Sequence, residues 1–124
     1  MTEPLALVFY ERLLPGTQLV NRLQDLGYRV RALDQPDRLP EVAQEQSPLV
    51  VLVDAEPSRG DVLAAIRRLR STAATAHLPV VAFTSRDAPE AREAALQAGA
   101  TLVVLDAALL GHLPQMLEQA LQVE

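Results

Sequence analysis

The chain has 124 residues, the size of one domain, so we expect a single domain over residues 1–124. Because 49% of the residues are apolar and only 3% are aromatic, its core should consist of Leu, Val and Ala. A net charge of −5 argues against nucleic-acid binding, and the lack of cysteine excludes disulfides. The lack of a long apolar run argues against a membrane span. The first residues contain no basic region of the signal-peptide kind, so a cytoplasmic location is expected.

Short apolar runs alternate with amphipathic stretches along the chain, which is typical of βα units around a parallel sheet. In the first part of the chain, this pattern predicts strands at 5–9, 28–33 and 49–53, and helices at 16–26, 38–46 and 60–71. With the two further strands predicted in the second part of the chain, five such units would form an open sheet with helices on both faces, because crossovers between parallel strands are right-handed.

The second part of the chain continues the alternation. Strands are predicted at 80–84 and 101–105, separated by a helix that starts at a cap on Asp87 and ends at Gly99. A loop or short turn is expected at 107–112, followed by a last helix over 113–121. Ligands of such sheets bind at the carboxyl ends of strands, where Asp54 and Thr84 lie.

Three segments give the chain a resemblance to the response-regulator receiver domain family, which extends over nearly its whole length. "LVVLVD" resembles the strand that carries the phosphoacceptor, "VVAFTS" the strand that ends in a hydroxyl residue, and "ALQAGA" the stretch before the family's lysine. The resemblance implies a flavodoxin-like sheet of order 2-1-3-4-5. It places Asp54 at the phosphoacceptor position and Thr84 at the hydroxyl position.

The chain departs from the family's pattern at several functional positions. Where the family has two acids that hold a divalent cation, this chain has Phe9 and Tyr10, followed by Glu11. The family's lysine is replaced by Asp106, and no other lysine is present, because all 11 basic residues are arginines. Val103 stands where the family has a switch aromatic.

These departures matter because phosphoryl transfer to a carboxylate needs positive charge around it, from a bound cation and an ammonium group. The chain therefore resembles a degenerate receiver, or pseudo-receiver: a non-enzymatic interaction module in signal transduction, with no metal or cofactor. Phe9 and Tyr10 are expected to fill the cation's space with apolar surface. Asp106 is expected to repel Asp54, so that Asp54→Asn would slightly raise stability.

The partners implied by the resemblance are proteins, including a second copy of the chain, and neither nucleic acid nor membrane. The family uses the fourth helix, the fifth strand and the last helix for such contacts. The matching candidates are Arg92, Ala95, Leu96, Leu102, Val104, Met116 and Glu118.

Two other functions stay open from the sequence. One is an atypical phosphorylatable receiver in which Glu11 and Asp54, with Glu56 and Asp106 nearby, hold a cation around the acceptor. The other is a small-ligand or nucleotide-binding module that uses the same crevice. A weak sequence signal for it is Gly16 after the first strand, where an ordinary loop turn is the favoured interpretation, and a bound anion near Gly16 or Gly60 would support it.

Overall fold

The computed structural model describes residues 4–55, 61–86 and 88–122. Five parallel strands form one sheet in the order β2-β1-β3-β4-β5, which confirms the predicted fold class and strand order. The strands are β1 Leu5–Phe9, β2 Arg29–Leu33, β3 Val50–Asp54, β4 Val80–Thr84 and β5 Leu102–Leu105. The three central strands are buried along their whole length, as expected for near-continuous apolar runs in a parallel sheet.

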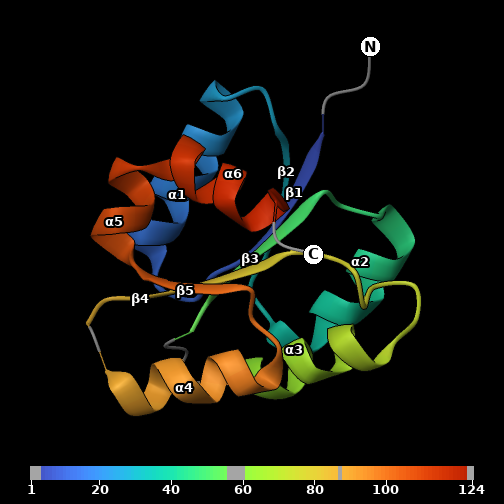
Figure 1. Ribbon diagram of the computed structural model, residues 1–124. Coiled ribbons are helices and arrows are strands. Elements are labelled where there is room, and N and C mark those ends of the chain that lie inside the picture. Colours follow the sequence, from blue (N-terminus) through green and yellow to red (C-terminus); the bar gives the residue numbers. More distant parts are fainter. Residues whose placement is uncertain (1–3, 56–60, 87, 123–124) are drawn as a thin grey trace.

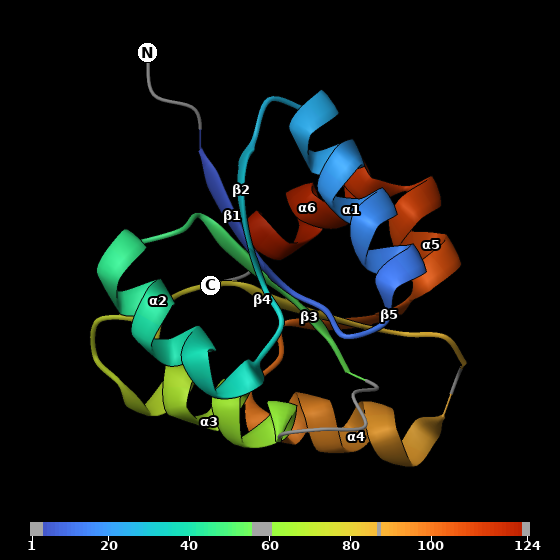
Figure 2. The ribbon, with the colours of Figure 1, turned by 180° about the vertical axis from the view of Figure 1, so that it is seen from behind.

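Helices cover both faces of the sheet (Figure 1). One layer contains α1 Leu13–Asp25, α5 Asp106–Gly111 and α6 Leu113–Gln122. The other contains α2 Leu39–Gln46, α3 Val62–Ser71 and α4 Pro89–Ala98, with a short 3-10 helix, η1 Pro36–Arg38, before α2. The view from behind shows the same two layers (Figure 2). No helix in the described part of the chain is long and apolar enough to cross a membrane.

Side chains alternate between two core clusters along each strand. Leu7 and Phe9 of β1 pack with the α2 and α3 layer, whereas Ala6 and Val8 pack with the α1 and α6 layer. Phe9 pairs with Val53 across the β1–β3 ladder, so the carboxyl ends of these strands lie side by side. This edge of the sheet positions the candidate site.

The start of α1 differs from the prediction. The helix begins at Leu13, three residues before Gly16, and Gly16 lies inside it. The prediction of a loop turn at Gly16 is therefore wrong. The glycine is explained by packing, because a Cβ at this position would overlap the ring of Tyr10. Gly16 permits a close approach between the helix and the residue that follows β1.

The segment predicted as a loop at 107–112 is also different, since α5 occupies most of it. Asp106 starts α5 directly after β5, and Leu109 anchors the short helix in the core. Gly111 ends α5, and Pro114 falls in the first turn of α6, where a missing N–H costs nothing. Helix α4 begins at Pro89 with Ala88 at the N-cap position, and the predicted cap, Asp87, lies outside the described residues.

Candidate functional site

Asp54 is the last residue of β3 and its side chain is completely buried. Its Oδ2 atom accepts hydrogen bonds from two backbone N–H groups of the β1–α1 connection, those of Glu11 at 3.2 Å and Arg12 at 3.0 Å. The carboxylate therefore ties β3 to the start of α1.

The side chain of Arg12 occupies the remaining space beside Asp54. Its Nε donates to Oδ1 at 3.0 Å and to Oδ2 at 3.2 Å, and its Nη2 lies 3.0 Å from Oδ1. On its other side the guanidinium donates from Nη1 to Asp106 Oδ2 at 2.7 Å and from Nη2 to Asp106 Oδ1 at 3.1 Å. One guanidinium thus joins two carboxylates, each through two of its nitrogens, which is the geometry that makes Arg–carboxylate pairs strong.

The Arg12–Asp54–Asp106 network is largely shielded from water. The exposed side-chain fractions are 25% for Arg12, 0% for Asp54 and 19% for Asp106. Burial alone would lower the pKa of Arg12, but the hydrogen bonds and charges of Asp106 and Asp54 outweigh it and raise that pKa overall. The guanidinium also lies 5.9 Å from the centroid of the Phe83 ring, within the range of a cation–π contact.

The sequence did not indicate this role for Arg12. Repulsion between Asp54 and Asp106 was expected, but Arg12 lies between them and neutralises part of their charge. The expected effect of Asp54→Asn therefore reverses: the substitution would remove the charged acceptor of several hydrogen bonds and lower stability. The available signal was weak, since Arg12 is merely the only basic residue before Arg22.

Phe9 and Tyr10 do not take the place that was predicted for them. Phe9 is fully buried with Leu7 and Val53 in the core cluster of the α2 and α3 layer. Tyr10 is half-buried and packs with the opposite cluster, over Gly16. The group that lies directly against Asp54 is the Arg12 side chain, because the chain turns back toward β3 after Glu11.

Thr84 and Val103 lie on the neighbouring strands. The Thr84 side chain is almost buried, and its hydroxyl donates to the carbonyl of Arg86 at 2.9 Å, which stabilises the turn after β4. Val103 packs against the core of the α2 and α3 layer. Together with Arg92, both residues line a small hollow of about 120 Å³.

The described residues do not fit a magnesium ion beside Asp54. Magnesium takes carboxylate and water oxygens as ligands in an octahedron. Both oxygens of Asp54 already accept N–H groups, and a guanidinium lies against them. Within 4–55, 61–86 and 88–122, no group of three or more acidic or histidine side chains could hold a metal. Glu56, a member of the alternative cation site, lies outside these ranges.

Only some of the residues of the candidate interaction face are exposed at the surface. Ala95 is buried against the core and cannot belong to a surface, which corrects that assignment. Arg92, Leu96 and Glu118 are exposed. Leu102, Val104 and Met116 are half-buried, because they pack against the core cluster of the α1 and α6 layer.

Comparisons with known proteins show the family through a family model and the fold through solved structures. The model of the response regulator receiver domain matches residues 16–118. Among solved structures, the BeF3-activated receiver domain of Klebsiella pneumoniae RstA is 24% identical, with a TM-score of 0.83 over 96% of this chain and 99% of that one. A search of curated proteins gave no significant match.

Two further structures show the same architecture. The receiver domain of the sensor histidine kinase PA1611 from Pseudomonas aeruginosa, which holds magnesium in its active-site cleft, is 22% identical, with a TM-score of 0.87 over 98% of this chain and 100% of that one. The chemotaxis protein CheY4 of Vibrio cholerae is 18% identical, with a TM-score of 0.85 over 96% and 99% of the two chains.

Proposed function

The chain belongs to the response regulator receiver domain family, and we propose that it is a pseudo-receiver within it. In this proposal it is a non-enzymatic protein-interaction module of two-component signalling, and Asp54 is not phosphorylated. The observation that carries the proposal is the contact of Arg12 with both oxygens of Asp54.

Phosphorylation would require a carboxylate oxygen that can reach a phosphorus atom. Asp54 is fully buried, and its oxygens accept N–H groups from the Arg12 side chain and from two backbone amides. A phosphoryl donor would have to displace Arg12 from two carboxylates at once. It would also approach a network whose formal charge, one guanidinium against two carboxylates, is −1.

The network also supports a fixed conformation of this edge of the sheet. In a phosphorylated site, charge is added and removed as a signal. Here the positive charge beside Asp54 is the Arg12 guanidinium, which is part of the chain and stays in place. We therefore expect protein partners to recognise a permanent surface, for which the exposed residues Arg92, Leu96 and Glu118 are the candidates, in a homodimer or a complex with another protein.

The test is incubation with acetyl phosphate and magnesium, followed by intact-mass measurement of the wild type and of Asp54→Asn. A receiver that reacts with acetyl phosphate, added to the same tube, controls for the reagent. We expect no added phosphoryl mass on either form of this chain. One phosphoryl mass on the wild type that is missing from a folded Asp54→Asn variant would establish the phosphorylatable receiver instead.

A further inference from the structure

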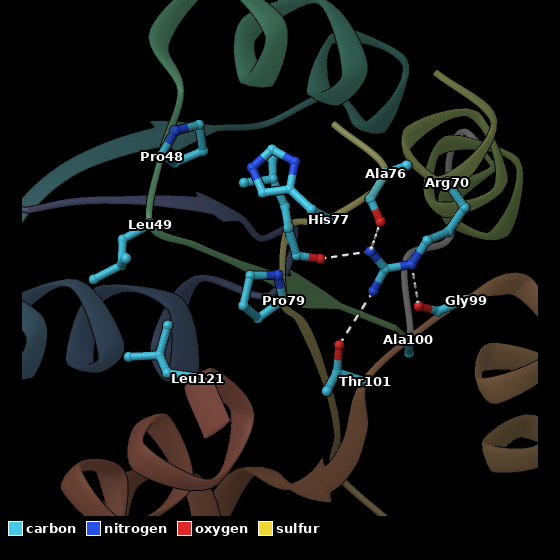
Figure 3. Close-up of a pocket in the computed structure, with 11 residues that line it drawn as sticks. Pro48, Leu49, Arg70, Ala76, His77, Pro79, Gly99, Ala100, Thr101 and Leu121 are labelled. Carbon is cyan, nitrogen blue, oxygen red and sulfur yellow. Dashed lines mark hydrogen bonds between the residues drawn. The ribbon is translucent and has the colours of Figure 1, made fainter. Parts of the chain in front are cut away.

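A hollow of about 690 Å³ lies at the amino ends of the strands, whereas Asp54 lies at their carboxyl ends. It is bordered by the residues that lead into β3, β4 and β5, and by Leu121 near the end of α6 (Figure 3). Pro48, Pro79 and Leu121 form apolar parts of its wall. Its volume falls in the range of sites for small molecules, roughly 300–1,000 Å³.

Arg70, from the last turn of α3, provides the charged part of this wall. Its Nε donates to the carbonyl of Gly99 at 2.8 Å, and its Nη1 donates to the carbonyls of Ala76 at 2.8 Å and Leu78 at 2.6 Å. Its Nη2 donates to the hydroxyl of Thr101 at 3.1 Å (Figure 3). These four bonds use four of the five N–H groups of a guanidinium, so one N–H on Nη2 has no acceptor among the described residues.

The approach of Arg70 to the α4–β5 connection depends on Gly99. This residue has φ of +125°, and a Cβ on it would overlap the Arg70 side chain. The glycine therefore leaves space for the Arg70 side chain. Hydrogen bonds to the protein itself position the guanidinium in the wall of the hollow.

The charge of Arg70 is not balanced within the described structure. Its acceptors are neutral, and within 4–55, 61–86 and 88–122 no Asp or Glu lines the hollow. Burial lowers the pKa of Arg70. Arg12 shows the opposite effect, because two carboxylates raise its pKa. His77, exposed on the rim, adds a second basic side chain. The hollow therefore has room for an anion and a cation in its wall to meet it.

We propose that this hollow binds an apolar monocarboxylate. The carboxylate would accept the remaining Nη2–H of Arg70 near Thr101, and the apolar part would lie against Pro48, Pro79 and Leu121. A small organic acid and the C-terminal residue of a polypeptide share this chemistry. The site is separate from the Arg12–Asp54–Asp106 network and does not depend on whether Asp54 is phosphorylated.

The test compares three probes by following amide NMR shifts of the full chain at constant ionic strength. N-acetyl-leucine carries the carboxylate, N-acetyl-leucinamide replaces it with a neutral amide, and 4-methylpentanoate lacks the peptide group. We expect saturable shifts at Ala76, Leu78 and Thr101 with N-acetyl-leucine, and affinity at least about tenfold lower for the amide. Equal binding of 4-methylpentanoate identifies a free acid as sufficient, whereas weaker binding identifies a polypeptide C-terminus.

Variants of the protein give a second test. Arg70→Gln removes the cation and should reduce N-acetyl-leucine affinity at least about tenfold. Arg68→Gln, an exposed position on the same helix, is the matched control and should bind like the wild type. Arg70→Gln also removes structural hydrogen bonds, so its fold is checked by circular dichroism. The comparison of acid with amide on the wild type decides independently: no saturable shift with the acid, or equal affinity of the amide, overturns the proposal.

Discussion

Arg12 and Arg70 illustrate how surroundings decide what a guanidinium does. Arg12 meets two carboxylates and neutralises part of their charge inside the site. Among the residues that the structure describes, Arg70 meets only carbonyls and a hydroxyl, so no counter-charge there balances it. Neither role follows from residue type, because Arg67 and Arg68, close to Arg70 in the sequence, are simply exposed.

Replacing Arg12 with alanine is expected to lower the free energy of unfolding by about 3 kcal/mol. The reason is that Asp54 would stay fully buried without its counter-charge. Urea denaturation measures the change. Arg67→Ala is the matched control, because Arg67 is exposed, and its effect should stay within about 0.5 kcal/mol. Equal stability losses for the two variants would contradict a stabilising role for the network.

Gly16→Ala is expected to destabilise the protein by about 1 kcal/mol, because the new methyl group would displace the Tyr10 ring. In contrast, Gly111→Ala places its methyl group in open space and should stabilise by about 0.5–1 kcal/mol. Thermal unfolding of both variants provides the measurement. In a Tyr10→Ala background the cost of Gly16→Ala should disappear, and a cost that persists there would rule out the proposed overlap.

At the scale of elements, the network explains why a helix forms directly after β5. Helix α5 has only six residues and is too short to be stable alone. Its first residue, Asp106, is held by Arg12, and Leu109 is buried in the core. Tertiary contacts therefore stabilise a segment whose sequence, with Gly111 and a nearby proline, predicts a loop.

We expect Asp106→Ala to increase hydrogen exchange of the α5 amides roughly tenfold while leaving α3 unchanged. Arg12→Ala should increase α5 exchange at least as much, although Arg12 is not in α5, because it removes the other half of the contact. Exchange measured by NMR on both variants distinguishes this from a local effect of Asp106 on the start of its own helix. Unchanged α5 exchange in Arg12→Ala would show that the contact does not order the helix.

At the scale of the molecule, the sheet could be predicted because its signal is local. The buried strands β1, β3 and β4 are apolar runs, and amphipathic segments separate them. The site could be predicted only in part. Asp54 was found from its place after an apolar run, whereas the partnership of Arg12 with Asp106 depends on segments that only the folded sheet brings together. No spacing rule within one segment encodes such a contact.

Magnesium is expected to leave thermal stability unchanged. A ligand of the native state adds about 2.7 kcal/mol at a concentration about 100 times its dissociation constant, so a working cation site would be visible as a higher melting temperature. The wild type should melt at the same temperature in magnesium chloride as in sodium chloride of equal ionic strength. A magnesium-specific increase that Asp54→Asn abolishes would instead support a cation site at Asp54.

The long sequence separation within the network has a consequence for folding kinetics. Arg12 lies 42 residues from Asp54 and 94 residues from Asp106 in the chain. Contacts of such high sequence separation pay a large loop-closure cost, and the contact of Arg12 with Asp106 cannot form until β5 has joined the sheet. We infer that it forms after the transition state and stabilises only the native state. Loss of Asp106 would then mainly accelerate unfolding, and the native state would have a shorter lifetime at a nearly unchanged folding rate.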